Sequence, residues 1–240
     1  MACSSTVDNR RTLLDNSASG GRFNGKAGFP PFPTYRSSDL IHMTVLILAS
    51  GSETRATLLR NAGLEISVQP ARIDEENLRL SLQADGATTA DLADALAEHK
   101  ALKVSQKNAE GLVLGCDQIL DLDGKVMTKP DSRDHARTQL LHLRGQTHCL
   151  LSAAVLYHQG KPVWRHTAVA RLTMRSFSDA FLERYLHENW QDIRHSVGCY
   201  QLEGPGIRLF SRIEGDYFGI LGLPLLELLN VLTLRKDIDG

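Results

Sequence analysis

From Met43 onward the chain alternates between short apolar runs and longer segments of helical periodicity, a pattern typical of α/β domains. We expect helices over 53–62, 88–106, 132–143, 178–188 and 222–235. We expect strands over 44–49, 66–69, 112–116, 148–157, 165–175, 197–202 and 206–213, and a hairpin over 119–127 that turns at Asp123 and Gly124. The two longest strands follow one another, so part of the sheet is antiparallel. The sequence therefore predicts a mixed β-sheet flanked by helices rather than a purely parallel, doubly wound fold.

Residues 1–42 lack this alternation. They contain four glycines, three prolines and six serines, with neither helical nor strand periodicity. Such a segment buries too little apolar surface to offset the entropy lost on ordering. We therefore divide the chain into a disordered extension over 1–42 and one domain over 43–240. For the extension, a translation start at Met43 and a transit peptide are both open, since it holds five basic and three acidic residues.

The charge balance and the cysteines narrow the class of protein. Lysine and arginine total 27, aspartate and glutamate 28, and the net charge of −1 argues against a general nucleic-acid coat or a polybasic membrane binder. No apolar run in the sequence reaches the roughly 18–20 residues of a membrane helix. The four cysteines are far apart and lack zinc-ligand spacing. We expect a cytoplasmic protein with free thiols, no nucleic-acid partner and no membrane partner.

The first strand-to-helix turn contains a candidate anion site. Ser52 is a good N-cap for the helix that follows, while Arg55 in its first turn opposes the helix dipole. An anion held by backbone N–H groups, the hydroxyls of Ser50 and Ser52 and the Arg55 guanidinium would explain that cation. Pairing of Arg55 with a surface carboxylate explains it equally well from this spacing alone. Neither a Walker A loop nor a GxGxxG motif occurs in the chain.

A second candidate group surrounds Asp117, which follows the apolar run over 112–116. Ligands of α/β sheets bind at strand ends, where burial or a nearby cation tunes a carboxylate as a base or metal ligand. A simple turn-forming role is the alternative. Lys100, Lys129 and the acidic run 74–76 can join Asp117, although each alone is more often a solvated surface group. The glycines over 198–222 either let a backbone approach a ligand closely or form tight turns.

Nine short motifs, taken together and in order, resemble the Maf family of nucleoside triphosphate pyrophosphatases. Each motif is weak by itself, but the series covers the chain from Met43 to about Arg235. In chain order they are LASxSxxRxxLL (48–59), IDE (73–75), AxxKA (97–101), GxD (115–117), LDG and KP (122–130), LxGxTH (143–148), EGxG (203–206), IEGDY (213–217) and GLPL (222–225). The resemblance implies a fold like that of inosine triphosphatases, with two lobes around a central cleft.

The resemblance also implies the chemistry. A nucleoside triphosphate would be cleaved to the monophosphate and pyrophosphate with the help of Mg²⁺ or Mn²⁺. Asp117 matches the proposed proton acceptor for the attacking water, and Glu75 matches an acidic residue needed for activity; both are the expected metal ligands. The expected triphosphate-binding residues are Ser50, Ser52, Arg55, Lys100 and Lys129. These roles agree with phosphoryl chemistry, in which catalysis is mostly positioning and charge neutralisation.

Three departures from the family pattern concern the choice of base. The usual Ser-Pro-Arg-Arg is here Ser52, Glu53, Thr54, Arg55, and the positions at which subgroups differ are Thr54, Gln118 and Glu203. Gln118 and Glu203 resemble the subgroup that acts on 7-methyl-GTP, whereas Thr54 does not. A carboxylate and an amide can read the Watson–Crick edge of guanine. We therefore expect a pyrophosphatase that favours purines or modified guanine.

Other functions stay open at this point. Members of the family are also associated with inhibition of septum formation, so a nucleotide-binding regulator without significant catalysis is the alternative to an enzyme. The presence of Lys100, Asp117 and Lys129 argues for the enzyme. The resemblance implies a homodimer as the oligomeric state.

Overall fold

The computed structural model describes residues 45–239, in which one mixed sheet of seven strands forms the centre. The extension predicted over 1–42 lies outside the described residues. The strands are β1 (Leu46–Leu48), β2 (Ile66–Val68), β3 (Leu112–Leu122), β4 (Lys125–Met127), β5 (Thr147–His158), β6 (Lys161–Met174) and β7 (Phe210–Glu214). Their order across the sheet is β2-β1-β3-β5-β6-β7, with β4 paired to β3. β1 runs parallel to β2 and β3, and every other pair is antiparallel, which confirms the predicted mixed sheet.

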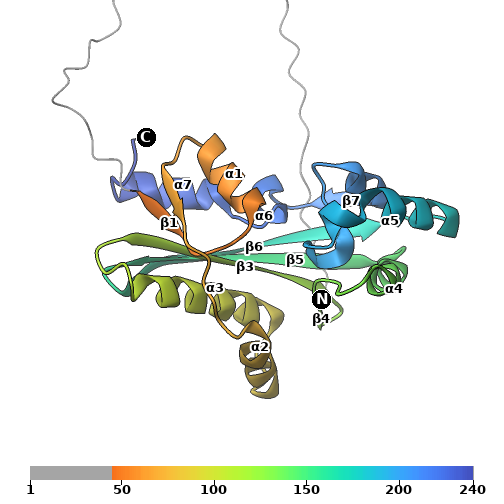
Figure 1. Ribbon diagram of the computed structural model, residues 1–240, viewed down its shortest axis with the longest axis horizontal. Helices are drawn as coiled ribbons and strands as arrows, with labels where there is room; N and C mark the ends of the chain where they lie inside the picture. Colours follow the sequence, from red (N-terminus) through yellow and green to blue (C-terminus); the bar gives the residue numbers. More distant parts are fainter. Residues whose placement is uncertain (1–44, 240) are drawn as a thin grey trace, which may run out of the picture. The chain divides into compact units, whose positions relative to one another are not determined.

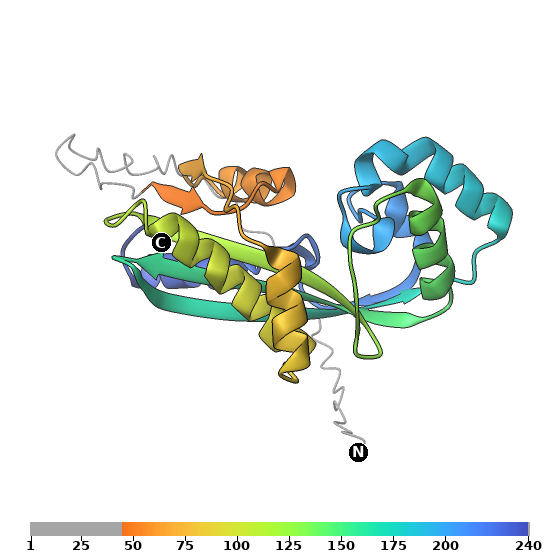
Figure 2. The same cartoon turned by 60° about the horizontal axis from the view of Figure 1, so that its bottom comes forward.

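The helices cover both faces of this sheet. They are α1 (Glu53–Asn61), α2 (Glu75–Ala84), α3 (Thr89–Ser105), α4 (Arg133–Leu143), α5 (Asp179–Ile193), α6 (Tyr217–Ile220) and α7 (Leu225–Leu234), with short 3-10 helices η1 (Val197–Cys199) and η2 (Pro205–Leu209). Figure 1 shows α3 against one face, and α1, α6 and α7 against the other. In Figure 2, α4 and α5 lie at the opposite end of the long strands from α1.

Side-chain alternation along the long strands produces three buried cores. Even-numbered residues of β1, β3 and β5, such as Leu48, Leu114 and Leu156, pack with α1 and α7. Odd-numbered ones, such as Val113 and Val155, pack with α3 on the other face. The far ends of β3, β5 and β6 pack with α4 and α5 in the third core. The domain therefore has two lobes that share the long strands β3 and β5, as expected.

The structure corrects several predicted boundaries. The strand over 112–116 and the first arm of the hairpin are one continuous strand, β3, which turns at Asp123 and Gly124 with φ of 52° and 78°. The predicted strand over 197–202 is wrong, because Gly198 and Cys199 have φ of 75° and 60°, which no strand accommodates. η2 occupies the first part of the strand predicted over 206–213. Helices α2 and α6 were not predicted, and α5 extends five residues beyond the expected end at 188.

The middle of β3 has an open edge, and this edge positions the candidate site. Residues 112–114 pair with β1 and residues 120–122 with β4, while residues 112–121 pair with β5 on the other side. Within the described part of the chain, residues 115–119 therefore have a strand neighbour on one side only. Asp117 and Gln118 lie in this stretch, so their side chains reach a space that no neighbouring strand fills.

Gly115 explains how closely α3 approaches this part of β3. A Cβ atom on Gly115 would lie 2.1 Å from the carbonyl oxygen of Ala97 and 2.6 Å from the backbone nitrogen of Ala101. Only glycine allows this distance between helix and strand. Because Asp117 is two residues further along, it faces α3 as Gly115 does. The glycine thus brings Asp117 within reach of the side chains of α3.

Two further glycines and two cysteines are closely packed. Cβ atoms on Gly198 and Gly206 would collide with neighbouring side chains and backbone, which supports the tight-turn interpretation of the glycine-rich segment. Cys116 and Cys199 are buried, as expected, and burial raises the pKa of their thiols to about 11 and about 12.

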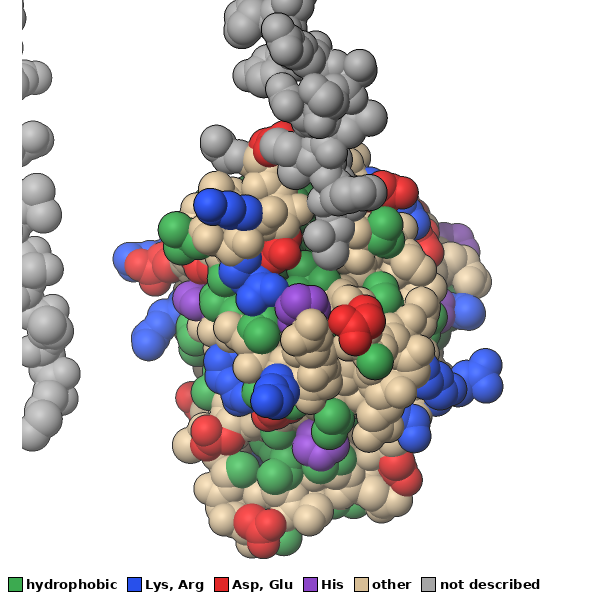
Figure 3. Space-filling model, turned by 90° about the vertical axis from the view of Figure 1, so that its left-hand side faces the viewer, with side chains coloured by type: hydrophobic (Ala, Val, Ile, Leu, Met, Phe, Trp, Pro, Cys, Tyr) green, Lys and Arg blue, Asp and Glu red, His purple; other side chains and the backbone are tan. Residues whose placement is uncertain are grey.

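On the face shown in Figure 3, basic, acidic and apolar side chains are interspersed. Over residues 45–239, none of the helices combines the length and the apolar character that crossing a membrane requires.

His148 makes the stability of the α4–α5 lobe depend on pH. Its side chain is buried beside Tyr200 and Phe210, Nε2 lies 2.7 Å from the Tyr200 hydroxyl, and burial lowers its pKa to about 4. Between about pH 6.5 and pH 4 the unfolded chain binds a proton at this residue that the folded chain does not. The free energy of unfolding should therefore fall by about 3 kcal/mol as the pH is lowered through this range.

Urea unfolding at a series of pH values tests this expectation. In His148→Gln, which does not titrate, the fall should disappear, whereas the exposed His142→Gln on α4 should retain it. An unchanged pH dependence in His148→Gln would assign the effect to other groups.

Candidate active site

A cavity of about 1030 Å³ lies between the two lobes along the open edge of β3. Its walls come from the start of α1, from α2 and α3, from the segment between β4 and α4, and from the segment after η1. All ten candidate site residues predicted from the sequence line it. They are Ser50, Ser52, Thr54, Arg55, Glu75, Lys100, Asp117, Gln118, Lys129 and Glu203.

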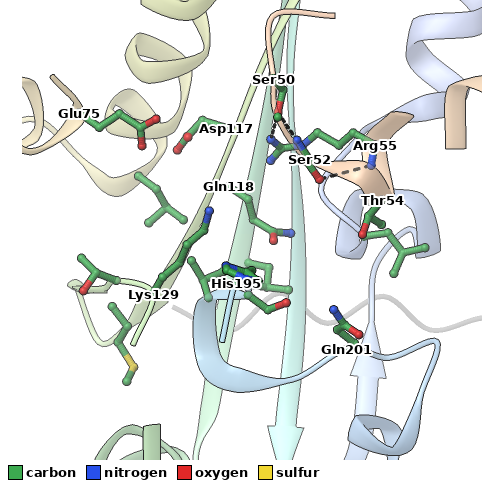
Figure 4. Close-up of a pocket in the computed structure, with 18 of the residues that line it drawn as sticks. Ser50, Ser52, Thr54, Arg55, Glu75, Asp117, Gln118, Lys129, His195 and Gln201 are labelled. Atoms are coloured by element: carbon green, nitrogen blue, oxygen red, sulfur yellow. Dashed lines mark hydrogen bonds between the residues drawn. The ribbon is translucent and has the colours of Figure 1, made fainter. Parts of the chain in front are cut away.

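The ammonium group of Lys100 joins two of the candidate carboxylates. Its Nζ lies 2.6 Å from Oδ1 of Asp117 and 3.0 Å from Oε1 of Glu75. Lys100 and Asp117 are buried, whereas Glu75, the first residue of α2, is exposed. The surface interpretation of Lys100 is therefore wrong, since its side chain points inward from α3. Figure 4 shows the carboxylates of Glu75 and Asp117 turned toward one another.

Burial sets the protonation of Asp117. Loss of solvation raises the pKa of this carboxyl above its ordinary value, while Lys100 and then Arg55 oppose the rise. A buried carboxylate with a raised pKa that stays close to a cation can take up a proton during a reaction. Asp117 is thus suited to the role of a general base.

Arg55 is buried and held by three bonds. Its Nε donates to the carbonyl oxygen of Gly222 at 2.7 Å, and its Nη1 donates to Oγ of Ser50 at 3.1 Å and to the carbonyl oxygen of Cys116 at 3.3 Å. No carboxylate of residues 45–239 takes part, and Arg55 is buried, so the alternative of a surface ion pair is wrong. A guanidinium has five N–H groups, and the two on Nη2 have no partner among residues 45–239. They are available to an anion in the cavity that Arg55 lines.

The serine hydroxyls of this turn organise the helix start. Ser52 Oγ accepts from the backbone N–H of Arg55 at 3.4 Å, which confirms Ser52 as the N-cap. Ser50 Oγ accepts from the backbone N–H of Ser52 at 3.3 Å. Two of the backbone donors that we expected to face an anion are therefore used within the protein. The hydroxyls position Arg55 and the turn, so the guanidinium is the main group of this turn that can bind an anion.

Gln118 faces the opposite side of the sheet from Asp117, because side chains alternate along a strand. Its Nε2 donates to Oγ of Ser152 and to the carbonyl oxygen of Ile220, both at 2.9 Å. Both hydrogens of the amide nitrogen are thus used, which leaves Oε1 as the hydrogen-bonding atom for the cavity. Gln118 consequently offers an acceptor to a ligand.

The α4–α5 lobe supplies the other wall. Lys129 and Glu203 are exposed there, and Figure 4 shows Lys129 extending toward Gln118. His135, His195 and Gln201 also line the cavity, and sequence reasoning missed them. The histidines lack any ligand spacing in the sequence, so no signal sets them apart from the other seven.

Acidic side chains outnumber basic ones in the cavity, which disfavours an anionic ligand such as a triphosphate. Seven carboxylate residues line it against four lysines and arginines. A ligand with several negative charges would need further cations to bind here. Among the described residues, no group of three or more His, Cys, Asp and Glu side chains could hold a metal ion. Mg²⁺, however, commonly binds one or two carboxylates together with substrate phosphates. Glu75 and Asp117, which reach the same Nζ, fit that mode of binding.

Comparison with known proteins gives consistent matches. A family model described as "Maf-like protein" matches residues 45–235. The nucleoside triphosphate pyrophosphatase of Ruegeria sp. (strain TM1040) is 54% identical over 196 residues, which are 82% of this chain and 98% of that protein. The nucleoside triphosphate pyrophosphatase of Roseobacter denitrificans is 55% identical over 193 residues, 80% of this chain and 97% of that protein. The 7-methyl-GTP pyrophosphatase of Brucella suis is 50% identical over 199 residues, 82% of this chain and 100% of that protein.

Replacement of Lys100 should change the titration of Asp117. In Lys100→Met the favourable interaction with the cation is lost while burial remains, so the pKa of Asp117 should rise further above its ordinary value. In Lys100→Arg, which keeps the charge, the rise should be smaller. Carbon-detected NMR titration of the Asp117 carboxyl measures both values. A lower or unchanged pKa in Lys100→Met would contradict this account of the pair.

Proposed function

The chain belongs to the Maf family, and from this membership and the geometry of the cavity we propose that it hydrolyses nucleoside triphosphates to nucleoside monophosphate and pyrophosphate. The observation that carries the proposal is the buried Asp117, held at 2.6 Å from Lys100 in a cavity that also contains Arg55 and Lys129. A base surrounded by cations is what water attack on a polyphosphate requires. We assign this activity to the domain over 43–240.

Asp117 acts as the proton acceptor. It takes a proton from a water molecule whose oxygen forms a bond to the α-phosphorus. The bond from that phosphorus to the bridging oxygen breaks, and pyrophosphate leaves with the electron pair. The raised pKa of Asp117 favours acceptance of the proton, while Lys100 keeps enough of the carboxylate ionised to begin.

The cations hold the triphosphate in place. Arg55 offers Nη2 from the α1 side, and Lys129 approaches from the other lobe. Lys100 already forms ion pairs with two carboxylates. It can therefore bind a phosphate oxygen more strongly once one of these carboxylates binds another cation instead. Ser50 and Ser52 act indirectly, because their hydroxyls fix the turn and the orientation of Arg55.

A divalent cation fits the donor set of this cavity. Glu75 and Asp117 would hold Mg²⁺ or Mn²⁺ together with phosphate oxygens, because two carboxylates and a substrate suffice for such ions. When bound, the ion neutralises phosphate charge and activates water. The excess of carboxylates over lysines and arginines in the cavity supports this requirement.

Substitution of Asp117 tests the reaction. Pyrophosphate release in Asp117→Asn should fall by about 100-fold or more, since the amide accepts no proton. Asp121→Asn is the matched control, because Asp121 lies on the same strand outside the cavity and should leave the rate unchanged. In ¹⁸O-labelled water the label should enter the monophosphate. Label in pyrophosphate would place the attack at another phosphorus, and nucleotide binding without release would favour the regulator.

For the base we propose guanine or 7-methylguanine. Gln118 offers Oε1, and Glu203 offers a carboxylate. Guanine presents two neighbouring donors, N1–H and its amino group, whereas uracil and thymine present one N–H between two carbonyl groups. Two acceptors therefore match guanine better, and methylation at N7 adds a positive charge that a carboxylate favours.

A substrate panel measures this preference. We expect kcat/KM to be higher for 7-methyl-GTP and GTP than for UTP and dTTP. Glu203→Gln should reduce the preference by about 10-fold, because the amide keeps one acceptor oxygen but replaces the other by a donor and carries no negative charge. Glu188→Gln on α5, outside the cavity, should leave the preference unchanged. Preferred hydrolysis of UTP and dTTP by the native chain would overturn the assignment.

We also propose a cellular location and an oligomeric state for the protein. We place it in the cytoplasm, a location that the free thiols of Cys116, Cys149 and Cys199 support. We also keep the homodimer as the expected oligomeric state, which analytical ultracentrifugation measures directly.

A further inference from the structure

Lys129 depends on its backbone for its position. The side chain is exposed and has no ion-pair partner among residues 45–239. It belongs to the short segment 128–132 that joins β4 to α4. A lysine side chain is long and flexible, so the place of its ammonium group follows from where this segment is held.

Gln139 holds one end of that segment. This residue of α4 is only 5% exposed, and its Nε2 donates to the carbonyl oxygen of Thr128 at 2.9 Å. Its Oε1 accepts from the thiol of Cys199 at 3.3 Å. Because burial raises the pKa of Cys199 to about 12, the thiol keeps its proton and remains a donor. Gln139 thus ties the residue before Lys129 to η1.

The same amide also controls the other end of the segment through His135. Gln139 Nε2 lies 3.0 Å from Nε2 of His135 and can only donate, so this ring nitrogen accepts. On the other side of the ring, Nδ1 lies 3.1 Å from Oδ1 and 3.5 Å from the backbone nitrogen of Asp131. Gln139 therefore contacts one nitrogen of a ring whose other nitrogen lies against Asp131, two residues after Lys129.

We propose that Gln139 is a positioning residue for Lys129, which it aims at the triphosphate by holding Thr128 directly and Asp131 through His135. The inference rests on the proposed function, since it assigns a role in binding the substrate of that reaction. An apolar residue would fill the same volume among Leu140, Leu143 and Ala136 without the cost of burying an amide. The cost of burying this amide is offset only by its hydrogen bonds to the three polar groups of Thr128, His135 and Cys199.

A double-mutant cycle tests the proposal. In the full chain, Gln139→Leu should raise KM for the nucleoside triphosphate by about 5-fold, with kcat changed less than 2-fold. Lys129→Ala should raise KM by about 10-fold, as expected for loss of a charged contact. In the Lys129→Ala background, Gln139→Leu should have no further effect on KM. A merely structural role would give independent effects that multiply.

Controls separate this test from folding and from the proposed function. Gln146→Leu makes the same change at an exposed position after α4 and should leave both constants unchanged. If Gln139→Leu fails to fold, Gln139→Glu replaces it in the same cycle, because it keeps the volume but lacks the donor to Thr128. Effects of the two substitutions on KM that multiply, or a loss of kcat at constant KM, would overturn the inference. The proposed function would still stand in that case, provided that the native chain releases pyrophosphate. Absence of release by the native chain would overturn both.

Discussion

The ammonium group of Lys100, held between Asp117 and Glu75, is the interaction on which the rest of the site depends. A cation close to both favours the ionised form of a buried carboxylate that lies beside a second carboxylate. Lys100 reaches them because α3 packs closely against β3, and that contact requires a glycine at position 115. The pair therefore links the packing of a helix on a sheet to the protonation of the group that is suited to act as a base.

The open edge of β3 gives this pair access to a ligand. β1 ends its pairing at Leu114 and β4 begins at Leu120, while β5 continues along the other side. The gap exposes the side chains of a central strand without breaking the sheet, and the two lobes at either end enclose it. The alternation of a strand then separates two tasks, since Asp117 faces α3 and Gln118 faces α6. In the proposed reaction, proton transfer and recognition of the base therefore use side chains on opposite faces of one strand.

Several polar groups of the cavity are positioned by hydrogen bonds within the protein. Arg55 is fixed by two carbonyl oxygens and a hydroxyl, Gln118 by Ser152 and Ile220, and the segment of Lys129 by Gln139. Such contacts restrict long side chains before a ligand binds, which reduces the entropy lost on binding. Because carboxylates outnumber lysines and arginines in the cavity, we expect binding of the proposed polyphosphate to depend on added cations.

The sequence by itself determined the mixed sheet, the turn at Asp123 and Gly124, the N-cap at Ser52 and ten of the residues that line the cavity, because these follow from local patterns and short motifs. Tertiary structure alone decided whether Lys100 turns inward, which acceptors hold Arg55, and that residues 197–199 form a turn of helix. Gly222 is 167 positions from Arg55 and Cys199 is 60 from Gln139, so neither contact leaves a periodic trace in the chain. Local chemistry names the candidates, but only long-range packing decides the direction in which each side chain points and which of its hydrogen bonds remain for a ligand.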